Sequence, residues 1–166
     1  MEDVDKALKT AIENEIKSHS LYSDASKKIE EKAIKEALIF LAKQELGHIK
    51  NIKKFSSDYL KKNFSYKIPK HDRKIKSLFG KVVSSKDIML TKELERVYRL
   101  ALEIEISGYD YYKKTMEETA NENLKRFFKF LMEEENNHYI LLEGTYKFLK
   151  EPSLFYAGDE NWNFEG

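Results

Sequence analysis

The tetrapeptide Glu135-Asn136-Asn137-His138 repeats, 90 residues later, the pattern of Glu45-Leu46-Gly47-His48. Both are Glu-x-x-His, and residues three positions apart lie on the same face of an α-helix. If the surrounding segments are helical, each tetrapeptide therefore directs one carboxylate and one imidazole the same way.

A further glutamate stands 30 residues before each tetrapeptide. Glu15 belongs to the sequence AIENEI at 11–16, and Glu105 belongs to the similar sequence ALEIEI at 101–106. The chain thus carries Glu…Glu-x-x-His twice, with equal spacing. Four carboxylates and two imidazoles from four helices form a cage suited to two divalent metal ions. The predicted metal ligands are Glu15, Glu45, His48, Glu105, Glu135 and His138.

Steps of three and four residues mark the core side of four predicted helices. These stripes lie within the segments 4–29, 34–59, 94–115 and 124–149. Such periodicity is typical of amphipathic helices packed at a shallow angle. All six predicted ligands fall on the stripes. The sequence therefore predicts an all-α arrangement: a four-helix bundle with its ligands in the core.

The bundle is expected at 1–150. Turns near 29–31 and 119–121 are predicted to join its four long helices into two antiparallel hairpins. Thr91 and Asn121 are expected N-caps. The lysine-rich segment 62–90 is long enough to cross the whole bundle, which would make the second and third long helices parallel.

Two segments outside the long helices are expected to pack on the bundle. Ile75, Leu78 and Phe79 predict a short helix lying on it. In the tail 151–166, the aromatic residues suggest docking on the bundle.

Composition excludes several classes of site. The 166 residues include no cysteine, so this chain provides no disulfide, zinc–thiolate or iron–sulfur ligand. A net charge of +1 argues against a nucleic-acid surface. The acidic start lacks the features of a signal peptide, and no apolar run is long enough to span a membrane. A cytoplasmic protein without a membrane partner is expected.

Charge is the strongest argument for metal. Four ionised carboxylates in one dry layer repel each other and are strongly unfavourable. None of the 30 lysines and arginines lies on the stripes beside them, so the compensating charge is expected from outside the chain. Two divalent ions supply it, and their oxidation would be balanced by an oxo or hydroxo bridge. Carboxylate and imidazole ligands suit iron or manganese.

Several further residues have both a functional and a structural interpretation. Tyr22 and Tyr112 follow Glu15 and Glu105 by two turns. They either hydrogen-bond a ligand carboxylate or relay electrons, or they serve as ordinary core aromatics. Ser18 and Gly108 either leave room for a small oxidant or permit close helix packing. Four other residues are interpreted as structural or solvent-facing: His19, His71, Glu133 and Glu134.

With these motifs, the sequence resembles the ferritin-like di-iron carboxylate proteins, and among them the rubrerythrins. The resemblance covers nearly all of 1–150. It implies that Glu45 and Glu135 bridge two metals. It also implies that Glu15 with His48, and Glu105 with His138, are terminal ligands. Two departures stand out: no cysteine-bearing rubredoxin module is present, and Gly108 replaces a carboxylate that rubrerythrins carry one turn after the third-helix glutamate.

By this resemblance, the expected function is a peroxidase or oxidase. It would reduce hydrogen peroxide or O₂ at a di-iron centre, with manganese or a mixed metal pair as alternative cofactors. Electrons would come from a separate, rubredoxin-like donor protein, and a homodimer is expected. Two other functions stay open: ferroxidase-type iron handling, as in ferritins, and a non-catalytic bundle locked by metal.

Overall fold

Five helices make up the described part of the chain. The computed structural model describes residues 2–59, 67–70, 74–85 and 88–153. The helices are α1 (Glu2–Lys28), α2 (Lys32–Tyr59), α3 (Ile75–Ser84), α4 (Lys92–Glu118) and α5 (Glu122–Lys150). Within the described residues there is no strand. The expected all-α bundle is confirmed.

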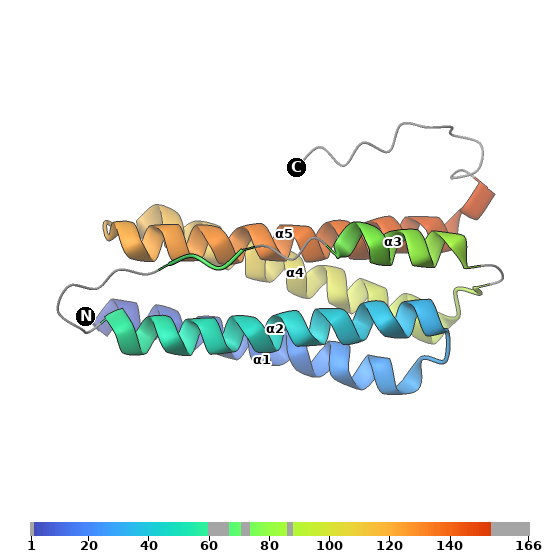
Figure 1. Ribbon diagram of the computed structural model, residues 1–166, viewed down its shortest axis with the longest axis horizontal. Helices are drawn as coiled ribbons and strands as arrows, with labels where there is room; N and C mark the ends of the chain where they lie inside the picture. Colours follow the sequence, from blue (N-terminus) through green and yellow to red (C-terminus); the bar gives the residue numbers. More distant parts are fainter. Residues whose placement is uncertain (1, 60–66, 71–73, 86–87, 154–166) are drawn as a thin grey trace.

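Two long hairpins form the bundle, one from α1 and α2 and the other from α4 and α5. Three-residue turns at 29–31 and 119–121 connect the helices of each pair, as the sequence predicts. In Figure 1, α2 and α4 run in the same direction, so the connection between them returns along the length of the bundle. The hairpins meet where α1 contacts α4 and where side chains of α2 and α5 stack, as Phe55 does on Phe127 with ring centroids 4.3 Å apart.

Both expected N-caps are present. The Thr91 hydroxyl accepts a hydrogen bond from the Leu94 amide at 3.1 Å, and the Asn121 side chain accepts one from the Leu124 amide at 3.0 Å. Each cap satisfies an amide that the helix itself leaves without a partner. The second hairpin is therefore fixed at its two helix starts by side chains that the sequence identifies.

The short helix expected around Ile75, Leu78 and Phe79 is α3. Leu78 is buried, and α3 contacts both α2 and α5. Phe79 packs onto α5 at Gly144, where an added Cβ would lie 3.0 Å from the Phe79 ring. A glycine at this point lets the short helix approach α5 closely. The connection thus covers one side of the bundle core rather than only spanning it.

The core consists of two apolar clusters separated by a polar layer. One cluster includes Leu41 and Leu94, and the other includes Phe55 and Phe127. Along every long helix, the predicted ligands lie between residues of the first cluster and residues of the second. The bundle therefore encloses its polar layer between two apolar clusters that exclude water.

Some expectations fall outside the described residues. These are the position of His71 and the docking of the tail beyond residue 153.

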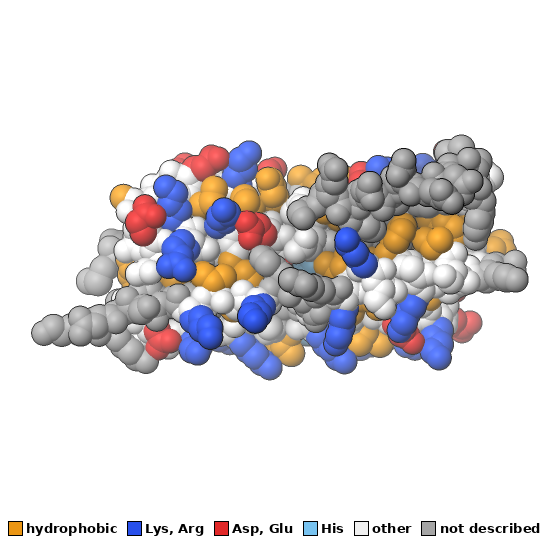
Figure 2. Space-filling model, turned by 45° about the horizontal axis from the view of Figure 1, so that its top comes forward, with side chains coloured by type: hydrophobic (Ala, Val, Ile, Leu, Met, Phe, Trp, Pro, Cys, Tyr) orange, Lys and Arg blue, Asp and Glu red, His pale blue; other side chains and the backbone are white. Residues whose placement is uncertain are grey.

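On the face drawn in Figure 2, Lys and Arg side chains are scattered, with acidic, apolar and uncharged side chains between them. None of the described helices is both long and apolar enough to cross a membrane.

Leu41 tests the contribution of the first apolar cluster. It is fully buried, and Leu→Ala at such a site costs about 2–5 kcal/mol because it loses transfer free energy and leaves a cavity. Leu41→Ala is expected to lower the free energy of unfolding by that amount in chemical denaturation with chelator present. Leu100→Ala, at a position that is 40% exposed, is the matched control and should cost far less. Equal losses in the two variants would contradict this core assignment.

Candidate metal centre

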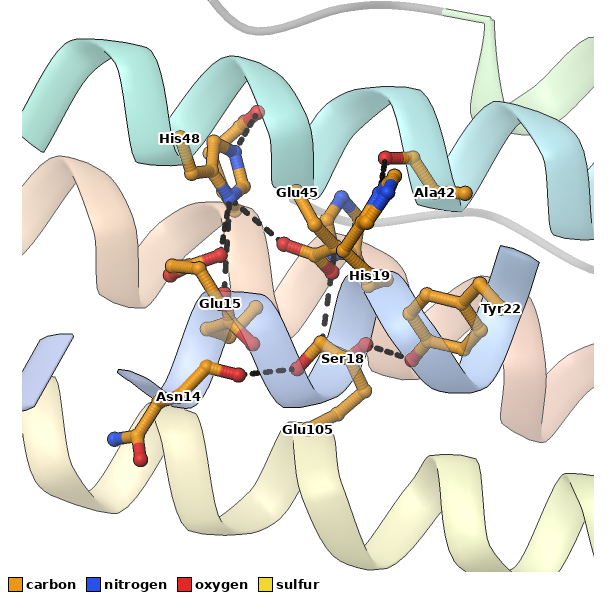
Figure 3. Close-up of polar contacts among 12 residues, drawn as sticks. Asn14, Glu15, Ser18, His19, Tyr22, Ala42, Glu45, His48 and Glu105 are labelled. Carbon is orange, nitrogen blue, oxygen red and sulfur yellow. Dashed lines mark hydrogen bonds and ion pairs between the residues drawn. The ribbon is translucent and has the colours of Figure 1, made fainter. Parts of the chain in front are cut away.

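The six predicted ligands converge in the polar layer. Glu15 comes from α1, Glu45 and His48 from α2, Glu105 from α4, and the last two from α5: Glu135 and His138. Each is at most 2% exposed. Figure 3 shows Glu15, Glu45 and His48 pointing toward one another from α1 and α2. The heptad stripes thus bring together residues as far apart in sequence as 15 and 138.

These side chains form two overlapping groups. Glu15, Glu45, His48 and Glu135 place one ligand atom each within 4.8 Å of one another. Glu45, Glu105, Glu135 and His138 do the same. Glu45 and Glu135 belong to both groups, while each of the other four belongs to one. This division favours two ion positions that share two carboxylates.

Glu45 lies between the two imidazoles. Its Oε2 is 3.0 Å from Nδ1 of His48, and its Oε1 is 3.0 Å from Nδ1 of His138. Nδ1 of His48 is also 3.1 Å from Glu15 Oε2, and Nδ1 of His138 is 3.5 Å from Glu105 Oε2. Both histidines therefore present Nδ1 to the carboxylates, and each Glu45 oxygen faces a different histidine.

Unsatisfied polar atoms indicate what the layer is built to hold. Among the described residues, four buried side-chain atoms lack a hydrogen-bond partner: Glu45 Oε1, Glu105 Oε2, Glu135 Oε1 and His138 Nδ1. Buried polar atoms are rarely left unpaired, because each costs about 1–3 kcal/mol. The His138 nitrogen is close to carboxylate oxygens but not aligned for hydrogen bonding, as expected when several lone pairs point at a common ion. The residues present fit a divalent metal pair.

Two tyrosines link the halves crosswise. Tyr22 of α1 donates a hydrogen bond to Glu105 Oε1 of α4, and Tyr112 of α4 donates one to Glu15 Oε1 of α1. Both rings are fully buried. The hydrogen-bonding interpretation of these tyrosines is confirmed. Each hydroxyl occupies one oxygen of its glutamate and leaves Oε2 facing a histidine, which fixes the orientation of the carboxylate.

Small residues open the layer on the α1–α4 side. A Cβ at position 108 would lie 2.8 Å from Glu135 Oε2, so Gly108 gives Glu135 its space. A cavity of about 250 Å³ at this place is lined by Ser18 and Gly108 together with Glu15 and Glu135. The role expected for the two small residues, room for a small molecule, fits this cavity. A second cavity, of about 170 Å³, reaches Glu105 between Ile106 and Tyr139.

Comparison with known proteins agrees with this geometry. The family model named Rubrerythrin matches residues 6–146. This chain belongs to the rubrerythrin family. No curated protein matches it. A solved structure, the hypothetical protein Pfu-1136390-001 from Pyrococcus furiosus, has a similar fold. Its TM-score is 0.64 at 22% sequence identity, and the match covers 91% of this chain and 94% of that one.

In this member of the rubrerythrin family, protons balance much of the charge when no metal is present. Burial and the nearby Glu45 raise the pKa of Glu15 to about 8. Burial and three neighbouring carboxylates raise the pKa of Glu135 well above its usual value. Despite burial, Glu45 and Glu105 raise the pKa of His138 to about 10. The expectation that compensation must come from outside the chain is therefore incomplete.

The pKa shifts of His48 and Glu45 follow from the same contacts. Burial opposes the charged form of His48, but Glu15, Glu134 and Glu45 raise its pKa well above the usual value. Burial likewise opposes ionisation of Glu45, but the two histidines hold its pKa well below the usual value. A metal ion must displace the protons on the ligands, so its affinity is expected to rise with pH.

Glu134 is the residue that sequence reasoning missed. The pair Glu133-Glu134 is expected to face solvent, but Glu134 is only 4% exposed, and its Oε2 lies 3.4 Å from Nε2 of His48. The expectation is wrong for Glu134 because the buried face of α5 is wider than the single row of residues that carries Glu135 and His138. A second row, spaced by sevens, contains Phe127, Glu134, Leu141 and Phe148, all buried. That spacing is the signal that identifies Glu134 as a core residue.

His19 keeps its expected structural role. It is half-buried, and its Nδ1 lies 2.7 Å from the Ala42 carbonyl of α2. Because a carbonyl only accepts hydrogen bonds, Nδ1 carries the proton. His19 belongs to neither ligand group, and Figure 3 shows it turned to the α2 backbone.

The raised pKa values predict how stability depends on pH in the metal-free protein. Glu15 and Glu135 hold their protons more tightly when folded than when unfolded, and so do both histidines. Their contributions to stability are present at low pH and are lost as pH rises through the folded-state pKa values, about 8 for Glu15 and about 10 for His138. With chelator present, Tm is expected to fall by several degrees between pH 6 and pH 9.

Glu15→Gln should make that fall smaller, because it removes one of the titrating groups. Glu13→Gln, at an exposed position on the same helix, is the matched control and should leave it unchanged. A Tm that is constant or rises between these pH values would contradict the proton balance described here.

Proposed function

We propose that this protein is a di-iron oxidoreductase that reduces hydrogen peroxide, or O₂, with electrons from a separate donor. The observation that carries the proposal is the pair of four-residue ligand groups sharing Glu45 and Glu135. Membership of the rubrerythrin family supports iron as the metal. Glu45 and Glu135 would bridge the ions. Glu15 with His48 would complete one site, and Glu105 with His138 the other.

When bound, two ferrous ions would supply the two electrons that, with two protons, convert one hydrogen peroxide into two waters. The chain's residues provide the setting. Four carboxylates give a charge of −4, which neutralises two divalent ions. The hydroxyls of Tyr22 and Tyr112 keep Glu105 and Glu15 aimed inward. The apolar clusters on either side keep bulk water from the layer, which strengthens electrostatic interactions within it.

The cavity beside Gly108 supports a small oxidant as substrate. It leads to Glu15 and Glu135, and its volume of about 250 Å³ admits small molecules such as peroxide. Rubrerythrins carry a second carboxylate one turn after the glutamate of the third long helix. In this chain that position is Gly108, which leaves space instead of a ligand. The given sequence has no cysteine to hold a rubredoxin-type iron, and we propose that a separate donor returns the electrons.

Stopped-flow oxidation tests the reaction. The protein is loaded with Fe²⁺ without oxygen and mixed with hydrogen peroxide or, separately, with O₂. Fast oxidation of both ions by peroxide, and slower oxidation by O₂, is the expected result. Glu45→Gln is the matched variant, because it keeps the size of the side chain but removes a charge shared by both ions, and it should slow the reaction sharply.

Two outcomes would contradict the proposal. Oxidation by peroxide no faster than that of free Fe²⁺ would leave a metal-stabilised bundle without this activity. A preference for O₂ with repeated turnover of added Fe²⁺ would assign the protein to iron handling as a ferroxidase.

A further inference from the structure

Glu134 is a fifth buried glutamate next to the metal centre, and the proposed reaction does not use it. Its side chain is 6% exposed. Oε2 lies 3.4 Å from Nε2 of His48, and Oε1 accepts a hydrogen bond from the Asn137 side chain at 3.4 Å. A buried carboxylate is costly unless it is paired. Its position behind a predicted ligand therefore calls for an explanation.

The His48 ring is held on several sides. It stacks on the His138 ring, with centroids 5.5 Å apart and planes inclined by 16°, and Phe130 contacts it edge-on at 6.3 Å. Nδ1 faces Glu15 and Glu45 at 3.1 and 3.0 Å. Glu134 lies at the opposite nitrogen, where its Oε2 accepts a hydrogen bond from the Nε2–H group of His48. With a metal ion in the layer, that hydrogen bond would keep a proton on Nε2 and leave the Nδ1 lone pair to the ion.

The two halves of the chain differ at this position. Counting back the 90 residues that separate the repeats, Glu134 corresponds to Gln44, which is half-buried on α2. A glutamine is neutral where Glu134 carries a carboxylate. A nitrogen of His138 also lies within 4.8 Å of a Glu134 oxygen, but the hydrogen bond goes to His48. The extra negative charge therefore belongs mainly to one of the two ion positions.

We propose that Glu134 is a positioning residue that holds His48 for metal binding through Nδ1 and makes the two ion positions unequal. The ion held by Glu15 and His48 is the more tightly bound, because the carboxylate behind His48 orients the ring and makes it a better electron donor. For the ion held by Glu105 and His138, the residue at the corresponding position is Gln44, which has no negative charge. This inference rests on the metal centre proposed above, but not on its reaction with peroxide.

Zn²⁺ binding tests the inference without any redox chemistry. Affinities are measured by competition with a chromophoric chelator for the unmodified chain, Glu134→Gln and Glu134→Leu. Both variants keep the size of the side chain. Gln removes the charge but can still accept a hydrogen bond, whereas Leu removes both. One of the two Zn²⁺ ions is expected to bind about 10- to 100-fold more weakly in Glu134→Leu, with Glu134→Gln between that variant and the unmodified chain.

Glu133→Gln is the matched control, because it removes a neighbouring charge from a side chain that is 42% exposed. It should leave both affinities nearly unchanged. Equal affinities in Glu134→Leu and the unmodified chain would overturn the inference and leave the metal centre intact. An unmodified chain that binds fewer than two Zn²⁺ would overturn the metal centre, and the inference with it.

A measurement on the unmodified protein covers the case in which the variants do not fold. Nitrogen-15 NMR of the histidine rings in the Zn²⁺-loaded protein reports which ring nitrogen carries a proton. His48 is expected to show a protonated Nε2 that exchanges slowly with water and an Nδ1 bound to metal. A His48 ring with its proton on Nδ1 would overturn the inference.

Discussion

Mutual repulsion among carboxylates in one buried layer governs the rest of the structure. Four of the glutamates face each other with almost no exposure, so the layer is stable only with protons or metal ions between them. The apolar clusters above and below must therefore supply the stability that the layer itself lacks. The same enclosure makes the layer useful, because charges interact strongly where water is excluded. Burial of the carboxylates therefore both destabilises the layer and strengthens its interactions with metal ions.

The halves of the chain repeat, but the centre they form is not symmetric. The tyrosines are exchanged evenly, Tyr22 to Glu105 and Tyr112 to Glu15, so each hairpin orients a ligand of the other. Small residues and Glu134 break the symmetry. Gly108 opens space beside Glu135, and Glu134 forms a hydrogen bond with His48, whereas the corresponding residue of the other half is the neutral Gln44. The larger cavity reaches Glu15 and Glu135 beside Gly108, and the smaller one reaches Glu105, so the two proposed ion positions differ in their surroundings.

Much of this arrangement could be predicted from periodicity. Heptad stripes and the 90-residue repeat predict that the six side chains meet in one layer, as they do in the structure, since both depend on local helix geometry. Thr91 and Asn121 identify helix starts. Packing between segments distant in sequence was harder to predict from periodicity. The Glu133-Glu134 pair resembles a charged surface, and only the width of the buried face of α5 reverses that interpretation. The protonation of the layer could not be predicted from the sequence either, because it depends on distances such as the 3.0 Å between Glu45 Oε1 and His138 Nδ1.

The number and position of bound ions test the central claim most directly. Crystals of the protein loaded with Mn²⁺ under anaerobic conditions would give anomalous diffraction peaks at the ions. The account predicts two peaks inside the polar layer, with Glu45 and Glu135 contacting both, and one histidine at each. A single peak, or two peaks that share neither glutamate, would contradict it.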